Sequence, residues 1–214
     1  MKKECTTTLP RKKGAHMTKN SYKGIIQKEA KRRKIKVLRW HKPGSVQTYE
    51  AYFESRSIRV PDPIDDHHFL ICLHEIGHLV TGERNYSYLM EYNAEQWAIN
   101  RAKERYNIVD ELYIVDAKEY VIRCMIADIV VRGLKINQIK QKVLDWIGIS
   151  KKEVQEVVLA NAASIVLDWA RKKNILAEEE LADLIITDMP LGDTITKELY
   201  KVEEEEATIE LQGS

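Results

Sequence analysis

Hydrophobic residues recur with helical spacing over most of the chain, after an early region of short, alternating stretches. The alternating stretches predict three strands over residues 35–40, 47–53 and 57–60. The helical spacing predicts helices over residues 21–33, 69–80, 91–106, 117–132, 136–146, 151–171 and 176–187. Together they indicate an α+β fold, in which a small antiparallel sheet of about three strands packs on a helical core and an all-α C-terminal extension follows.

The helix over residues 69–80 carries three polar side chains in the apolar run FLICLHEIGHLV. His74 and His78 lie one turn apart on one face, so both imidazoles can reach a single metal ion. Glu75 lies about 100° round the helix from His74, where its carboxylate can reach a metal-bound water without being a ligand. Asp65 or Asp66 can cap the start of this helix, and Gly82 marks its end.

A metal ion would satisfy all three polar side chains of this buried helix. Unpaired buried polar groups cost several kcal/mol, so the bland interpretation of two surface histidines does not suit the apolar surroundings. Zinc suits two imidazoles and a carboxylate, and it lowers the pKa of its bound water to about 7. We therefore predict a site for one Zn²⁺ ion, with Glu75 as the catalytic base.

The helix over residues 91–106 supplies the candidate third ligand. Glu91 and Glu95 are one turn apart and border a face of small residues. We expect Glu91 to be the third metal ligand and Glu95 to accept a hydrogen bond from a ligand histidine, which fixes its tautomer. Glu95 as the ligand remains an alternative. The helices over 69–80 and 91–106 could approach closely, because their facing residues would be small: Gly77, Ala94 and Ala98.

A peptide hydrolase also needs a donor for the developing oxyanion and a surface for its substrate. Tyr88, close before Glu91, is the candidate for contact with the oxyanion or the substrate. The edge of the third strand could bind an extended peptide by strand addition, which would make residues 47–60 a substrate ledge.

The motifs in this order resemble those of the ImmA/IrrE-type zinc metallopeptidases, over about residues 21–107. That family has H-E-x-G-H followed by a helix with E-x-x-A-x-x-F-A. Here HEIGH follows a strand ending in SIRVP, and Glu91-Tyr92-Asn93-Ala94-Glu95-Gln96-Trp97-Ala98 matches the second motif, with Trp97 where the family often has Phe. The resemblance implies a gluzincin-like, zincin-type domain that cleaves a protein. In the family the substrate is often a helix-turn-helix repressor encoded nearby in a mobile element or stress operon.

Charge is concentrated at the two ends of the chain. Residues 1–42 hold 15 Lys and Arg against two acids, and residues 178–214 hold 12 Asp and Glu against two lysines. We expect a disordered basic arm over residues 1–20, a metallopeptidase domain over 21–110, a helical extension over 111–200 and an acidic disordered tail over 201–214. The arm is interpreted as solvated. The alternatives are a handle for nucleic acid or an acidic partner, and a contact with the acidic end.

Two further features bear on nucleic acid and on the compartment. Residues 143–154 partly resemble the turn of a helix-turn-helix reader, but Glu153 and Glu156 would repel phosphates, so nucleic acid is not favoured as a partner. Three widely spaced cysteines fit reduced thiols in a cytoplasmic protein. No apolar run suits a membrane span or a secretory signal.

The sequence thus predicts a cytoplasmic zinc metallopeptidase that hydrolyses a peptide bond in a protein substrate. One alternative is a DNA-binding or regulatory protein of a phage or mobile element, in which the zinc site is structural or a relic. Another is an interaction protein that uses the helical half and the charged ends.

Overall fold

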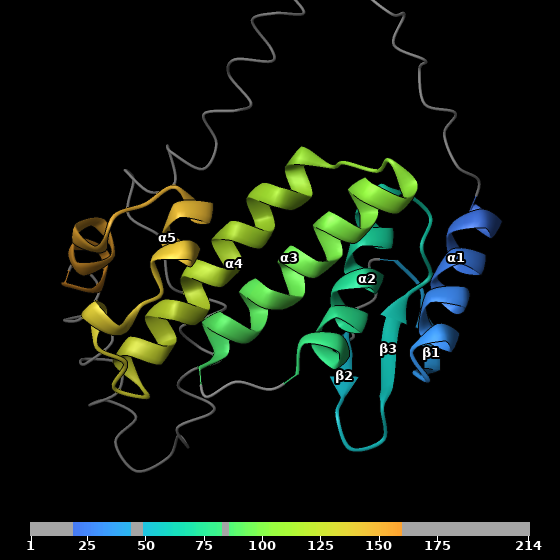
Figure 1. The fold of residues 1–214 in the computed structure, drawn as a ribbon, viewed down its shortest axis with the longest axis horizontal. Coiled ribbons are helices and arrows are strands. Elements are labelled where there is room, and N and C mark those ends of the chain that lie inside the picture. Colours follow the sequence, from blue (N-terminus) through green and yellow to red (C-terminus); the bar gives the residue numbers. More distant parts are fainter. Residues whose placement is uncertain (1–18, 44–48, 83–85, 160–214) are drawn as a thin grey trace, which may run out of the picture.

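The computed structural model describes residues 19–43, 49–82 and 86–159, and the elements follow the predicted order (Figure 1). The sheet contains β1 (Lys36–His41), β2 (Glu50–Tyr52) and β3 (Ser57–Pro61). The helices are α1 (Lys19–Arg32), α2 (Asp66–Thr81), α3 (Ser87–Tyr106), α4 (Glu111–Val130), the 3₁₀ turn η1 (Ile136–Gln138) and α5 (Gln141–Ile147), and residues 151–159 are also helical. Four predicted segments lie outside the described residues, namely 1–18 of the basic arm, 160–171 of the helix over 151–171, the helix over 176–187 and the acidic tail. Residues 19 and 20, also predicted to belong to the arm, begin α1 instead.

The fold is α+β, as predicted, but the sheet is mixed rather than antiparallel. Its strand order is β1-β3-β2, with β1 parallel and β2 antiparallel to β3. The central position goes to the most apolar strand, since Ile58 and Val60 of β3 are fully buried while β1 is largely exposed. The prediction of a free third-strand edge was therefore wrong, and the edges belong to β1 and β2.

The helix carrying the HEIGH motif has the predicted caps, although it starts three residues before the apolar run over 69–80. Asp65 is the N-cap, because its carboxylate accepts a hydrogen bond from the His68 backbone N–H at 2.8 Å. Gly82 ends the helix with a φ of 77°, a conformation that glycine adopts without steric cost.

Two later helices differ from their predicted bounds. Helix α3 starts one turn earlier than predicted. The helix expected over 136–146 is divided, because Ile139 and Lys140 are extended between η1 and α5.

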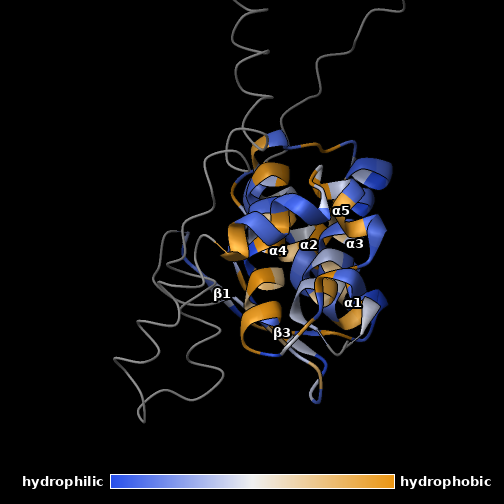
Figure 2. Ribbon diagram, turned by 90° about the vertical axis from the view of Figure 1, so that its left-hand side faces the viewer, coloured by the Kyte–Doolittle hydropathy of each residue, from blue (hydrophilic) through white to orange (hydrophobic). Residues whose placement is uncertain are grey.

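Two hydrophobic clusters form the core, and the helices carry both hydrophobic and hydrophilic stretches (Figure 2). The first cluster joins α1, β3, α2 and the small-residue face of α3. The second joins α3, α4, α5 and residues 151–159. The stretch that resembles a helix-turn-helix contributes Val143, Leu144 and Val154 to this second cluster, so its apolar side chains are used in packing.

Helices α2 and α3 approach closely at Gly77. A Cβ atom at this position would lie 2.7 Å from the Ala94 carbonyl oxygen, closer than side-chain carbons tolerate. Ala94 and Ala98 are both fully buried beside it. The small residues therefore set the spacing of the two helices, and this spacing positions their polar side chains.

A buried carboxylate ties α1 to α3 in the first cluster. Glu29 is fully buried and accepts hydrogen bonds from Arg101 Nη2 at 2.7 and 3.0 Å, and also from Arg33 and from the Tyr106 hydroxyl. Burial alone would raise the pKa of this carboxyl, but its donors outweigh that effect and the pKa is lowered. Hereafter we call these four residues the Glu29 cluster.

Candidate metal centre

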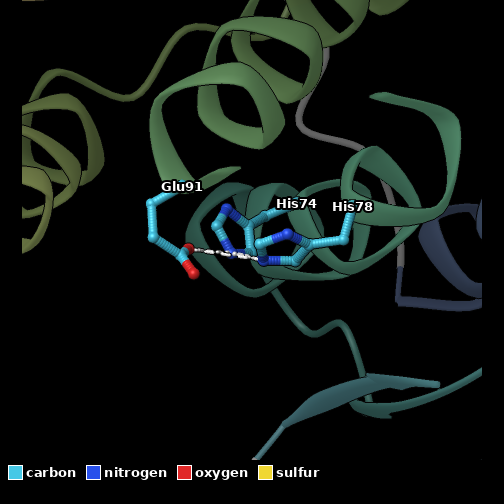
Figure 3. Close-up of side chains that lie close together, drawn as sticks. All are labelled: His74, His78 and Glu91. Atoms are coloured by element: carbon cyan, nitrogen blue, oxygen red, sulfur yellow. Dashed lines mark hydrogen bonds and ion pairs between the residues drawn. The ribbon is translucent and has the colours of Figure 1, made fainter. Parts of the chain in front are cut away.

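His74 and His78 on α2 converge with Glu91 on α3 (Figure 3). The two Nε2 atoms are 2.9 Å apart, and the Glu91 Oε2 atom lies 3.2 Å from His74 Nε2 and 3.3 Å from His78 Nε2. Each of the three residues offers one atom that could bind a metal, and these three atoms all lie within 4.8 Å of one another. The structure thus brings the three predicted ligand residues into one group that could hold a metal ion.

Polar atoms in this group lack ordinary hydrogen-bond partners. The Glu91 Oε2 atom is buried and, among the described residues, accepts no hydrogen bond of good geometry. The two Nε2 atoms face each other, although neutral imidazoles would bring two lone pairs together there. A cation between the three atoms would satisfy all of them, so the donor set fits a metal ion.

The buried charges of the group shift one another's ionisation. Burial opposes protonation of His74, but the carboxylates of Glu95 and Glu91 outweigh it and hold its pKa well above the usual value. Burial would raise the pKa of Glu91, yet the close imidazoles of His74 and His78 lower it to about 2. In the absence of a metal, protons on imidazole therefore balance the carboxylates.

Glu75 lies next to the group without belonging to it. Its side chain is buried, and the residue is 6 % exposed. Burial is the main cause that raises its pKa, against the opposing effect of His74 and His78. A buried carboxylate beside the ligand atoms, and not among them, is suited to exchanging protons.

Glu95 and Tyr113 hold His74 from the other side of the ring. The Glu95 Oε1 atom lies 2.9 Å from His74 Nδ1, and the Tyr113 hydroxyl donates to Glu95 Oε2 at 2.8 Å. His74 therefore turns Nε2 toward Glu91 and Nδ1 toward Glu95. The contact of Nδ1 with Glu95 has the distance, but not the angle, of the hydrogen bond that orients a ligand histidine.

The structure does not support Tyr88 as an oxyanion or substrate contact. Tyr88 is 1 % exposed, belongs to the second hydrophobic cluster, and accepts a hydrogen bond from the Lys140 backbone N–H at 3.3 Å. A substrate cannot reach this side chain. The prediction relied on proximity to Glu91 in the sequence, but Tyr88 points to α4 and α5 instead.

A different tyrosine borders the group. Tyr120 follows Tyr113 by seven residues, which places both on the same face of α4. Tyr113 meets Glu95 of α3, and Asp128, farther along α4, accepts a hydrogen bond from the first turn of α3. Helices α3 and α4 run antiparallel (Figure 1), and Tyr120 lies along α4 between the residues that make these two contacts.

Tyr120 combines solvent access with proximity to the buried carboxylates. The residue is 42 % exposed, whereas Tyr113 is buried. Burial of the hydroxyl raises the pKa of Tyr120, and Cys124, Glu91 and Glu75 add to the effect. Its hydroxyl therefore keeps its proton, and its hydrogen-bond partner in this structure is Cys124. Periodicity marks Tyr113 and Tyr120 as one face of a helix, but the sequence does not show that this face meets α3.

Comparisons with known proteins found no match to this chain among family models, curated proteins or solved structures.

Within the described ranges, none of the helices combines the length and apolar character needed to cross a bilayer. Cys72 and Cys124 are free and buried, and burial raises the pKa of both thiols.

Proposed function

We propose that this protein is a zinc-dependent metallopeptidase that hydrolyses a peptide bond in a protein substrate. The observation that carries the proposal is the convergence of His74, His78 and Glu91, with Glu75 buried beside them. Tetrahedral ligands about 2.05 Å from zinc lie about 3.3 Å apart. The distances of 3.2 and 3.3 Å between Glu91 Oε2 and the two imidazoles are close to that spacing.

The number of ligands favours catalysis over a structural role. Structural zinc sites have four protein ligands, whereas catalytic sites have three and keep one position open. Among the described residues, the group contains three ligand residues. When bound, zinc acidifies a water molecule and polarises a carbonyl group.

The surrounding side chains then have distinct tasks. Glu75 takes the proton of the attacking water and delivers it to the leaving amine, as general base and then general acid. Glu95 orients His74, and Tyr113 orients Glu95. Tyr120 takes the role first given to Tyr88, by donating a hydrogen bond to the carbonyl oxygen as negative charge develops.

The sheet offers a place for an extended substrate. Since β3 is paired on both sides, strand addition is open at β2, which also packs against α2. The resemblance to the ImmA/IrrE-type peptidases suggests a helix-turn-helix repressor as the protein substrate, acting in the cytoplasm.

Substitution of the glutamates tests these roles separately. Glu75→Gln should retain one equivalent of zinc and lower peptide cleavage by about 10²–10⁴-fold, because only the base is lost. Glu91→Gln should weaken zinc binding itself, and Glu95→Gln should weaken it by about 10–100-fold. Zinc content is measured by mass spectrometry, and cleavage is measured with a candidate repressor or a peptide library.

Two other outcomes would contradict these roles. If Glu95→Gln removed the metal while Glu91→Gln retained it, the ligand assignment would be wrong. If zinc-loaded protein cleaved no substrate and its metal had four protein ligands, the site would be structural. The alternative of a regulatory protein would then replace the peptidase.

A further inference from the structure

The surface between the end of α1 and β1 contains a basic hollow. The hollow has a volume of about 510 Å³. Three lysines line it, Lys31 and Lys34 from the end of α1 and the following turn and Lys36 from β1, together with Trp40. All three lysines are exposed. We call these four residues the lysine hollow.

No acidic side chain compensates this charge within the described part of the chain. Residues 21–43 contain nine Lys and Arg and a single acid, Glu29. Glu29 is fully buried and bound to Arg101, so it faces away from the surface. No ion pair between described residues joins Lys31, Lys34 or Lys36 to a carboxylate. Their mutual repulsion favours an anion in the hollow.

Further charge and an aromatic ring extend this surface. Lys28 and Arg39 are exposed on the same two elements. The Trp40 ring is partly exposed and has the Lys23 ammonium 4.7 Å from its centroid. A flat ring among lysines can stack a base while the lysines contact phosphates.

The lysine hollow is separate from the metal centre. In Figure 1, α1 and β1 lie on one side of α2, and α3, which carries Glu91, lies on the other. A ligand of the hollow would therefore leave the metal centre accessible.

We propose that the lysine hollow binds the backbone of single-stranded nucleic acid, with phosphates on the three lysines and a base against Trp40. The pairing of an aromatic ring with uncompensated lysines favours nucleic acid over an acidic peptide, which has no base to stack. This inference does not depend on the proposed peptidase activity. It also differs from the helix-turn-helix hypothesis, because residues 143–154 take no part in it.

The test is the salt dependence of binding by the full-length protein to a fluorescent 12-nucleotide oligothymidylate. Three phosphate contacts contribute a slope of about −2 to the logarithm of affinity against the logarithm of salt concentration. The triple variant Lys31→Gln, Lys34→Gln, Lys36→Gln should make the slope shallower by about 2. The variant Trp40→Leu should lower affinity by about tenfold and leave the slope unchanged.

A matched variant removes the same charge elsewhere. Lys103→Gln, Lys140→Gln, Lys152→Gln changes three exposed lysines on α3, before α5 and on the last described helix, and it should retain the slope of the unchanged protein. Equal slopes for the two triple variants would overturn the proposal. So would equal affinity for poly-glutamate of the same charge as the oligonucleotide, since the hollow would then accept any polyanion.

Discussion

The Glu29 cluster and the candidate metal centre of His74, His78 and Glu91 are two buried charged groups on neighbouring helices, but their charges are compensated differently. Glu29 is surrounded by arginines and a tyrosine, whose protons are permanent near neutral pH. In the candidate metal centre, Glu91 and Glu95 face imidazole nitrogens, which can give up a proton to bind a metal ion. Within the part of the chain that the structure describes, Glu91 also retains a buried oxygen without a hydrogen bond of good geometry.

This difference distinguishes a buried charge that holds helices together from one that could bind a metal ion. A buried carboxylate with permanent donors needs no further partner, and its removal leaves those donors without a charge partner between two helices. A carboxylate that depends on protonated imidazoles can exchange those protons for a metal ion, because metal ligands must be deprotonated. Variants in the two groups should therefore change different properties.

After Glu75→Gln, the largest expected effect is also on catalysis and comes from Tyr120. Tyr120→Phe removes one hydrogen-bond donor and should lower kcat by about 10²–10³-fold, with little change in KM or zinc content. Steady-state kinetics and metal analysis on the same preparation measure these quantities. Tyr88→Phe is the control and should leave kcat unchanged. Equal losses in both variants would remove Tyr120 from its role.

The next effect is on stability and comes from the Glu29 cluster. Glu29→Gln should lower the free energy of unfolding by about 3 kcal/mol at pH 7 and leave zinc affinity unchanged, because it leaves buried donors without their charge partner. The pKa of Glu29 is lowered in the folded state. Its contribution is thus complete above the unfolded pKa of about 4.3 and is lost as the pH falls through the folded pKa.

Denaturant titrations of the unchanged protein and of Glu29→Gln between pH 7 and pH 3 measure this linkage. The difference between the two proteins should shrink toward the acid end. A difference that grows with acid would contradict the lowered pKa.

A smaller effect is expected where the two helices of the metal centre touch. Gly77→Ala should cost about 1–3 kcal/mol and also weaken zinc binding, because the added methyl group must push α3 and Glu91 away. Gly24→Ala is the matched control. A Cβ there meets nothing within 4 Å, and alanine is the better helix former. The prediction fails if both alanine variants are equally stable and bind zinc equally.

Much of this arrangement could be predicted from local sequence patterns. The HEIGH spacing, the small residues at Gly77 and Ala94, and the one-turn separation of Glu91 and Glu95 are short-range signals that fix which side chains share a helical face. The structure brings the three candidate ligands together through the close α2–α3 contact that these small residues allow.

The errors arose where the answer depended on pairing between distant segments. The sequence shows three strands but does not determine their order in the sheet. Because β3 lies between β1 and β2, the sheet is mixed and β3 has no free edge. Tyr88 is near Glu91 in the chain but packs in the second hydrophobic cluster, whereas the tyrosine whose pKa Glu91 and Glu75 raise is Tyr120 of α4. Those outcomes depend on tertiary packing, which periodicity does not encode.

X-ray absorption at the zinc edge of the loaded, full-length protein tests the central claim most directly. We predict one ion with two imidazole ligands, one carboxylate oxygen and one further light-atom ligand that an added hydroxamate displaces. Glu91→Gln should lose this coordination and Glu29→Gln should retain it. A sulfur ligand, a fourth ligand from the protein, or the same spectrum in Glu91→Gln would contradict the assignment.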